Sequence, residues 1–124
     1  MPRILVIDDN AAIRELLRLV LEEEGYEVVE AADGAEGLQL YQAAPADLVI
    51  TDLQMPGMNG LELLMALQRM VPTPALMAIS GDRDALELAK GLTSYTFVKP
   101  LPLEQVLAAV RSLDLRHRSH GETA

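Results

Sequence analysis

Polar side chains follow four short apolar runs of this chain, and their types suit phosphate chemistry. The runs lead into Asp8 and Asp9, Asp52, Ser80, and Lys99. If the runs are parallel strands of one sheet, these groups meet at its carboxyl edge, where open α/β sheets bind ligands. The sequence therefore predicts one site that combines three carboxylates, a hydroxyl and an ammonium group.

The three carboxylates predict a bound metal ion. Asp8 and Asp9 are adjacent after an apolar strand, and Asp52 adds a third charge. Two carboxylates about 4 Å apart repel each other by about 4 kcal/mol at an effective dielectric constant of about 20, so a cation must offset them. Oxygen ligands that leave positions for water and phosphate suit Mg²⁺ better than Ca²⁺. A helix N-cap and a surface charge would explain Asp8 and Asp9 alone, but not the matching positions of Asp52 and Lys99.

Asp52 is placed to act as a nucleophile. It ends an apolar strand and precedes residues 53–60, a loop rich in turn formers, so we expect its carboxylate to be presented rather than buried. A carboxylate beside Mg²⁺ can attack a phosphoryl group in line and form an acyl phosphate. Metal ligation alone is the simpler alternative.

Lys99 and Ser80 are predicted to contact the phosphorylated carboxylate. Lys99 would pair with Asp52 at rest and with a phosphoryl oxygen afterwards, as a compact ammonium charge does well. Ser80 offers a hydroxyl that can donate to a phosphoryl oxygen, and Gly81 leaves the approach open. A plain salt bridge for Lys99 and a strand-ending N-cap for Ser80 are the simpler alternatives.

The elements that must position these residues alternate along the chain. Short apolar runs predict five strands, at residues 3–8, 27–31, 47–52, 75–80 and 95–99. Helical spacing predicts a helix after each strand, with only a weak pattern over 82–92. The connections are too long for hairpins, so we expect right-handed crossovers and a doubly wound parallel α/β sheet covered on both faces.

Helix start and stop signals agree with this alternation. They are the N-cap Asn10, the capping boxes Asp33 with Glu36 and Asn59 with Glu62, a left-handed Gly25 after the first helix, and Pro102 in the first turn of the last.

Composition narrows the class of protein. The chain has 124 residues, half of them hydrophobic, and no cysteine, which fits one domain without disulfides or thiolate chemistry. A net charge of −9 disfavours direct nucleic-acid binding and favours a cationic or metal-bearing partner. No leader or membrane span is evident, so we expect a cytoplasmic protein. Apolar periodicity is lost at Asp114, which predicts a folded domain over 1–113 and a disordered tail over 114–124.

Over about Arg3 to Leu113 the chain resembles the receiver domains of bacterial response regulators. The motifs that carry the resemblance are Val6-Ile7-Asp8-Asp9-Asn10, Ala32-Asp33-Gly34, the run from Asp52 to Gly60, Ser80-Gly81 and Val98-Lys99-Pro100. Their order on five predicted strand ends is highly specific. The resemblance implies a flavodoxin-like five-stranded sheet of order 2-1-3-4-5 with helices on both faces.

The resemblance also implies a role for each site residue. Asp52 would be the phosphoacceptor, and Asp8, Asp9 and Asp52 would hold Mg²⁺ together with the backbone carbonyl of Gln54. Ser80 would follow the phosphate, Lys99 would contact it, and the bond from Lys99 to Pro100 would be cis. Such a domain assists its own phosphorylation and dephosphorylation but is not a dedicated enzyme.

Partners follow from the same resemblance. A histidine kinase or phosphotransfer protein of a two-component system would donate the phosphoryl group, and an output domain or target protein would receive the signal. The domain would be a monomer or a phosphorylation-dependent dimer. The sequence leaves open whether it stands alone or belongs to a longer regulator.

One region departs from the family pattern. Nineteen positions separate Ser80 from Lys99, a shorter interval than the family usually has, so the fourth helix or its leading loop should be short. The family tends to place a switch aromatic three residues before the lysine, where this chain has Thr96 between Tyr95 and Phe97. We expect only one of the two aromatics to point outward, with Thr96 displaced by a bulge or shift. Tyr95 is the predicted switch, and Phe97 is then a core residue.

Three other functions compete with a phosphorylation switch. An aspartate-nucleophile phosphohydrolase would have Asp-x-Asp on the first strand, whereas here the pair is adjacent. A nucleotide-binding domain would have a glycine-rich phosphate loop in place of Asp8-Asp9-Asn10. A receiver-like interaction module that signals without phosphate would not require the complete set of site residues.

Overall fold

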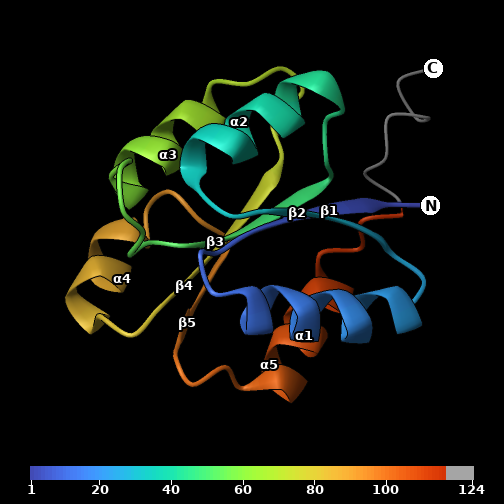
Figure 1. The fold of residues 1–124 in the computed structure, drawn as a ribbon. Coiled ribbons are helices and arrows are strands. Elements are labelled where there is room, and N and C mark those ends of the chain that lie inside the picture. The colour runs from blue at the N-terminus through green and yellow to red at the C-terminus, as the bar shows by residue number, and fades with distance from the viewer. Residues whose placement is uncertain (117–124) are drawn as a thin grey trace.

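The structure, a computed structural model, describes residues 1–116 and contains one parallel five-stranded sheet (Figure 1). The strands are β1 (Arg3–Ile7), β2 (Glu27–Ala31), β3 (Leu48–Asp52), β4 (Ala75–Ser80) and β5 (Tyr95–Val98). Their order across the sheet is β2-β1-β3-β4-β5, and every pair is parallel. The predicted α/β fold and strand order are confirmed.

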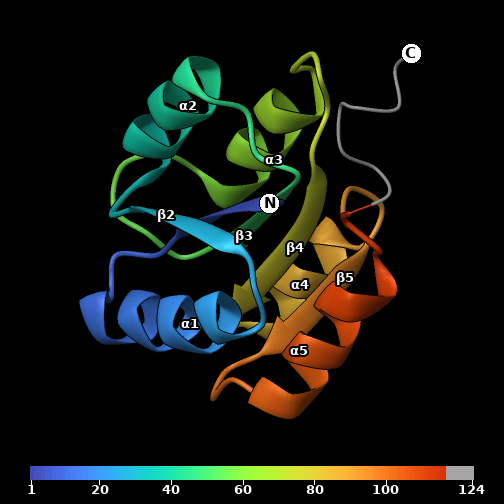
Figure 2. The ribbon, with the colours of Figure 1, turned by 90° about the vertical axis from the view of Figure 1, so that its right-hand side faces the viewer.

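Five helices cover the two faces of this sheet. They are α1 (Ala11–Glu23), α2 (Gly34–Ala43), α3 (Gly60–Gln68), α4 (Arg83–Ala89) and α5 (Leu103–Ser112). Figures 1 and 2 show α1 and α5 on one face and α2, α3 and α4 on the other. Only seven residues form α4, as the short interval between Ser80 and Lys99 predicted.

Both faces of the central strands are buried, which explains their continuous apolar sequences. Successive side chains of β1 point to opposite faces. Ile4 and Val6 pack in the core under α1 and α5, whereas Leu5 and Ile7 pack in the core under α2, α3 and α4. The two cores fix the sheet between its helices, so the strand ends that carry the polar residues have defined positions.

Caps confirm the predicted starts of α1, α2 and α3, whereas Pro102, which was predicted in the first turn of the last helix, is the N-cap of α5. The Asn10 side chain accepts hydrogen bonds from the backbone N–H groups of Ala12 and Ile13, and Asn59 caps α3 in the same way. Gly25 adopts a φ of +97°, the left-handed conformation expected at the end of α1. These local signals place α1 and α3 immediately after the loops that bear the site residues.

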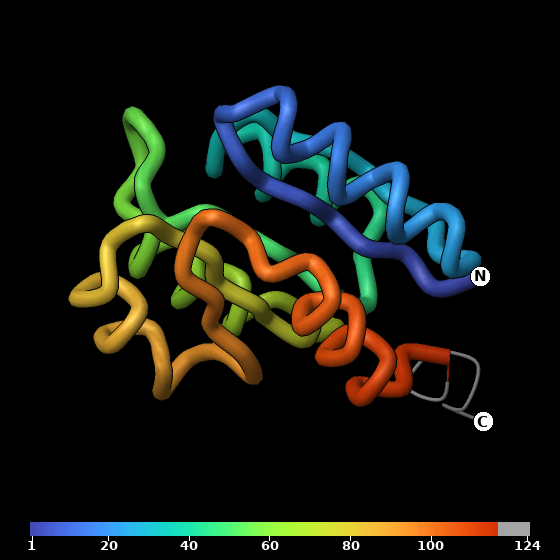
Figure 3. Tube along the Cα trace, turned by 90° about the horizontal axis from the view of Figure 1, so that it is seen from below, coloured from blue at the N-terminus to red at the C-terminus, as the bar shows by residue number. Residues whose placement is uncertain are grey.

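The prediction that a disordered tail begins at Asp114 is wrong. Leu115 is 1% exposed and belongs to the core under α1 and α5. The Arg116 guanidinium lies 5.1 Å from the centre of the Tyr26 ring, a cation–π contact. In Figure 3 this last part of the described chain, in red, lies on the same side of the molecule as the N-terminus. The remaining predicted tail, residues 117–124, lies outside the described residues.

Candidate functional site

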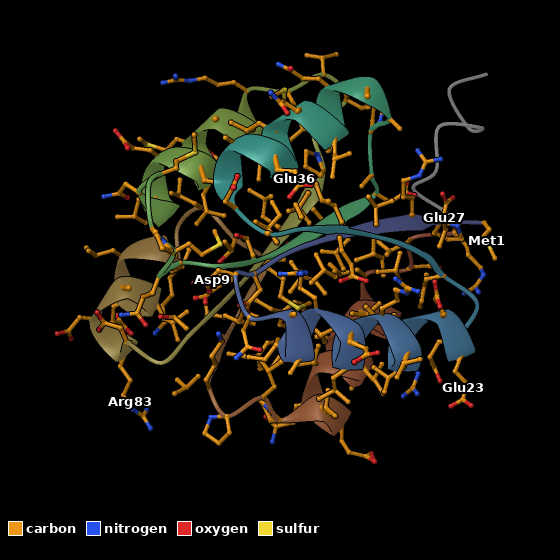
Figure 4. The ribbon with its side chains drawn as sticks, in the orientation of Figure 1. Met1, Asp9, Glu23, Glu27, Glu36 and Arg83 are labelled. Carbon is orange, nitrogen blue, oxygen red and sulfur yellow. The ribbon has the colours of Figure 1, made fainter. Side chains whose placement is uncertain are left out.

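Three carboxylates meet at the carboxyl ends of β1 and β3. The two strands are neighbours in the sheet, with Ile7 opposite Thr51, so Asp8 and Asp52 follow at the same edge. Asp9 lies on the loop after β1, at the opposite end of that strand from Met1 (Figure 4). One carboxylate oxygen from each of the three aspartates lies within 4.8 Å of the others. The predicted acidic cluster is thus present in the structure.

Lys99 joins the two buried members of this cluster. Its Nζ donates to Asp8 Oδ2 at 3.1 Å and to Asp52 Oδ2 at 2.9 Å. The second oxygen of each carboxylate accepts a backbone N–H group, from Asn10 at 2.9 Å and from Gln54 at 3.0 Å. The loop after each strand therefore holds the carboxylate that the strand presents, and Lys99 links the two.

The prediction that the Asp52 carboxylate is presented rather than buried is wrong. Asp52 is 3% exposed and Asp8 is fully buried, whereas Asp9 is exposed. Lys99 and the Gln54 N–H group cover the two Asp52 oxygens. A phosphoryl group that binds Asp52 would therefore have the Lys99 ammonium beside it.

Burial also determines the protonation of these groups. It raises the pKa of the Asp8 carboxyl above its usual range, although the Asn10 N–H group and the Lys99 ammonium act in the opposite direction. Burial by itself lowers the pKa of Lys99, but the hydrogen bonds and charges of Asp52 and Asp8 outweigh it, so the pKa is raised. Lys99 therefore stays an ammonium ion at neutral pH.

The acidic cluster fits Mg²⁺. Its three converging ligands are hard carboxylate oxygens, and Asp9 leaves one side open to solvent. One ammonium group does not neutralise three carboxylates, so a divalent cation would offset the remaining charge.

Ser80 lies beside this cluster at the end of β4. Ser80 is fully buried, and its backbone carbonyl oxygen accepts a hydrogen bond from the backbone N–H group of Lys99 at 2.8 Å. The Ser80 hydroxyl donates to Gln54 Oε1 at 3.1 Å and accepts from the Asp82 N–H group at 3.0 Å. The structure thus brings Ser80 and Lys99 together, as predicted, and adds a Gln54 side-chain contact that the sequence did not predict.

The aromatic residues of β5 are arranged differently from the prediction. Thr96 lies in regular register opposite Ala78, without a bulge. Tyr95 and Phe97 share one face and stack with ring centres 6.2 Å apart, and the Tyr95 hydroxyl lies 2.7 Å from the Ser112 hydroxyl of α5. Residues two apart on a strand point the same way, so the two aromatics share one face and the expected bulge or shift at Thr96 is wrong. Tyr95 is exposed on that face. Phe97 packs against the core as predicted, and the switch role of Tyr95 stays a prediction.

Arg14 was missed by the sequence reasoning. Its guanidinium donates to the backbone carbonyl of Asp8 at 2.7 Å and to Glu30 Oε1 at 3.1 Å. Arg14 comes one helical turn after the N-cap Asn10, which is the signal that could have placed it against the loop. From α1, Arg14 therefore helps to fix the backbone of Asp8, a member of the acidic cluster.

The bond between Lys99 and Pro100 is cis, as the family resemblance implied.

Among the described residues, no helix has both the length and the apolar sequence needed to cross a membrane.

The chain is similar to receiver domains in sequence. Residues 4–111 match the response regulator receiver domain family. The DNA-binding response regulator MtrA of Mycobacterium tuberculosis is 34% identical over 113 residues, which cover 89% of this chain and 49% of that protein. The transcriptional regulator RpaA of Synechocystis is 36% identical over 119 residues, covering 91% of this chain and 49% of that protein. The chain thus spans about half the length of these relatives.

Solved structures of receiver proteins have the same fold. The response regulator TrrA of Thermotoga maritima, solved in complex with Mg²⁺ and BeF, superposes with a TM-score of 0.83 at 33% identity and covers 91% of this chain and 99% of that one. The chemotaxis protein CheY4 of Vibrio cholerae gives a TM-score of 0.81 at 29% identity and covers 90% and 98%.

Sequence, fold and acidic cluster therefore agree. Members of this family are phosphoacceptors of two-component signalling rather than dedicated enzymes, and Mg²⁺ is present in the TrrA structure. With its Asp8, Asp9 and Asp52 cluster at the carboxyl edge of a 2-1-3-4-5 sheet, this chain belongs to the response regulator receiver domain family.

Proposed function

We propose that Asp52 accepts a phosphoryl group from the phosphohistidine of a histidine kinase or phosphotransfer protein. The observation that carries the proposal is the position of Asp52 between Lys99 and the Asp8 and Asp9 carboxylates. Asp8, Asp9, Asp52 and the Gln54 carbonyl are the proposed ligands of Mg²⁺. The TrrA structure, which is a complex with Mg²⁺ and BeF, supports a Mg²⁺ site in this chain.

In the proposed reaction an Asp52 carboxylate oxygen attacks the donor phosphorus. A bond forms between that oxygen and phosphorus, the bond from phosphorus to the donor nitrogen breaks, and its electron pair stays on the imidazole. When bound, Mg²⁺ offsets the negative charge of the attacking and transferred groups.

Lys99 is proposed to act on both sides of this step. Before transfer its ammonium group offsets the Asp52 charge, and after transfer it contacts a phosphoryl oxygen. Because Asp8 retains its own bond to Lys99 Nζ, the ammonium group stays at the site while its second partner changes. Ser80 is proposed to donate its hydroxyl proton to another phosphoryl oxygen.

The signal is proposed to leave the domain through α4 and β5, toward an output domain or a separate target protein. The names of MtrA and RpaA describe a DNA-binding response regulator and a DNA-binding transcriptional regulator, each about twice as long as this chain, which supports an output domain of that kind. Phosphorylation-dependent dimerisation and a cytoplasmic location stay predictions from the sequence.

Intact-mass measurement tests the phosphoacceptor directly. We expect incubation with acetyl phosphate and Mg²⁺ to add the mass of one phosphoryl group to the wild type and to Asp84→Asn, whose carboxylate lies in the first turn of α4. Asp52→Asn should gain nothing. An unchanged wild-type mass would refute the proposed function, and phosphate on the Asp52→Asn protein would assign the acceptor to another residue.

A further inference from the structure

The Ser80 hydroxyl already uses its only donor in this structure. It carries one proton, which it donates to Gln54 Oε1, and it accepts the Asp82 N–H group. Ser80 is also fully buried, so water does not offer it other partners. Because a serine hydroxyl has a single proton to donate, it cannot bind Gln54 and a phosphoryl oxygen at the same time.

Gln54 contacts both the acceptor carboxylate and Ser80. Its backbone N–H group donates to Asp52 Oδ1 at 3.0 Å, while its side-chain carbonyl accepts from Ser80. The backbone bond fixes residue 54 beside the carboxylate that would be phosphorylated. The side chain therefore competes for the Ser80 proton from a position next to the phosphoryl group.

We propose that Gln54 is a positioning residue that holds the Ser80 proton away from the phosphoryl group in the resting domain. The inference rests on the proposed function, because it concerns how the Asp52 product is recognised. Ser80 must exchange Gln54 for a phosphoryl oxygen before it can hold the phosphorylated state. Breaking the hydrogen bond between Ser80 and Gln54 thus reduces the net free energy with which the phosphoryl group is bound.

The surroundings of the two side chains allow this exchange. Gln54 is an exposed residue and lines a hollow of about 510 Å³ between the loop after β3 and α4, so its amide can turn toward water. Ser80 stays buried and needs an acceptor wherever it points. A charged phosphoryl oxygen is a stronger acceptor than a neutral amide, so the exchange is favourable only when the phosphoryl group is present.

A double-mutant cycle with Mg²⁺ and BeF tests the inference. The dissociation constant of BeF is measured at saturating Mg²⁺ by calorimetry for the wild type, Gln54→Ala, Ser80→Ala and the double variant. We expect Gln54→Ala to bind BeF about fivefold more tightly than the wild type, the factor expected for one neutral hydrogen bond. In the Ser80→Ala background the same substitution should have no effect.

Two controls accompany the cycle. Gln39→Ala removes an exposed glutamine from α2, outside the site, and should leave the BeF dissociation constant unchanged. Titration with Mg²⁺ alone measures the metal affinity of each variant, so every BeF constant is determined at saturating Mg²⁺ whatever the substitution does to the proposed Gln54 carbonyl ligand.

Three results would overturn the inference. Equal tightening with Ser80 present and in the Ser80→Ala background would show that Gln54 only obstructs the site. Weaker BeF binding by Gln54→Ala would show that its amide contacts the phosphoryl group itself, and an unchanged constant would show that the contact with Ser80 has no energetic role. In each case wild-type binding of BeF still supports the proposed function, whereas a wild type that does not bind BeF refutes both.

Discussion

The two halves of the carboxyl edge are held by different kinds of interaction. In the acceptor half, Asp8, Asp9 and Asp52 form a carboxylate cluster, and Lys99 joins Asp8 and Asp52 through two short bonds. In the readout half, at the end of β4 and the start of α4, Ser80 forms bonds with a neutral amide and a backbone N–H group. Ionic bonds among buried groups have few substitutes, whereas neutral hydrogen bonds exchange at little cost. The comparison indicates that the acceptor half is rigid, whereas the hydrogen bonds of the readout half can rearrange.

Removing the ammonium group of the acceptor half should have the largest effect. Lys99→Met keeps most of the aliphatic side chain but leaves two buried carboxylates facing each other. We expect the metal-free protein to lose about 3 kcal/mol of unfolding free energy, measured by urea denaturation with a chelator present. Mg²⁺ should restore part of this loss.

Lys90→Met is the matched surface control. Lys90 pairs with Glu87 on the exposed side of α4, and exposed pairs contribute little. If the two lysine variants were equally stable, charge would not be what holds the acceptor half together.

Removing one charge from the same half should have a smaller effect of opposite sign. Because burial raises the pKa of Asp8, the folded protein favours its protonated form, and this contribution to stability is lost as pH rises through the folded-state pKa. Asp8→Asn does not lose stability in this way, because the asparagine side chain stays neutral as the pH rises. At neutral pH without metal we expect it to be about 1 kcal/mol more stable than the wild type, or roughly 4 °C in melting temperature.

The pH profile of this gain sharpens the comparison. The melting temperatures of Asp8→Asn and the wild type should converge in acid, where Asp8 is protonated in both folded and unfolded chains. Asp8→Asn should also lose most of the increase that Mg²⁺ gives the wild type. Exposed Asp9 provides the contrast, since Asp9→Asn should gain less. A larger gain for Asp9→Asn would contradict the role of burial.

The smallest effect is expected at Tyr95, at the start of β5 and away from the carboxyl edge. Tyr95→Phe removes the hydroxyl that bonds Ser112 but keeps the stack on Phe97. We expect a loss of no more than about 0.5 kcal/mol, because the bond is exposed to water. Phosphate uptake at Asp52, followed by intact mass, should match the wild type. A slower or incomplete uptake would make Tyr95 part of the switch.

The acceptor half was predictable from the sequence because strand ends determine it. Parallel strands bring their carboxyl ends to one edge, so apolar runs that end in Asp8, Asp52 and Lys99 already place those residues together. The helix caps were equally local, since Asn10 and Asn59 bond to backbone groups two and three residues away. Interactions of this kind can be predicted from the order of the elements along the chain and from the alternation of side chains along each strand.

The missed features depend on side chains from distant elements. The contacts of Arg14 with the Asp8 carbonyl and Glu30 depend on how α1 packs against β1 and β2. The helical spacing from Asn10 gives the position of Arg14 on α1 but not these partners. The bond between Ser80 and Gln54 depends on the course of the loop after β3. Leu115 stands alone between Asp114 and Arg116, so its burial comes from tertiary packing and leaves no periodic signal.

The charges of the acceptor half connect two solutes. When all four groups are ionised, three carboxylates and one ammonium leave the site with two negative charges, which equal the charge of one Mg²⁺ ion in magnitude. A dianionic phosphoryl analogue is repelled from the metal-free site, and bound Mg²⁺ removes that repulsion. Linkage requires the effect to be reciprocal, so the analogue must raise the affinity for Mg²⁺ by the same factor. We therefore expect the domain to bind a phosphoryl analogue strongly only when free Mg²⁺ is also present. The concentration of free Mg²⁺ then sets the apparent affinity of the site for the analogue.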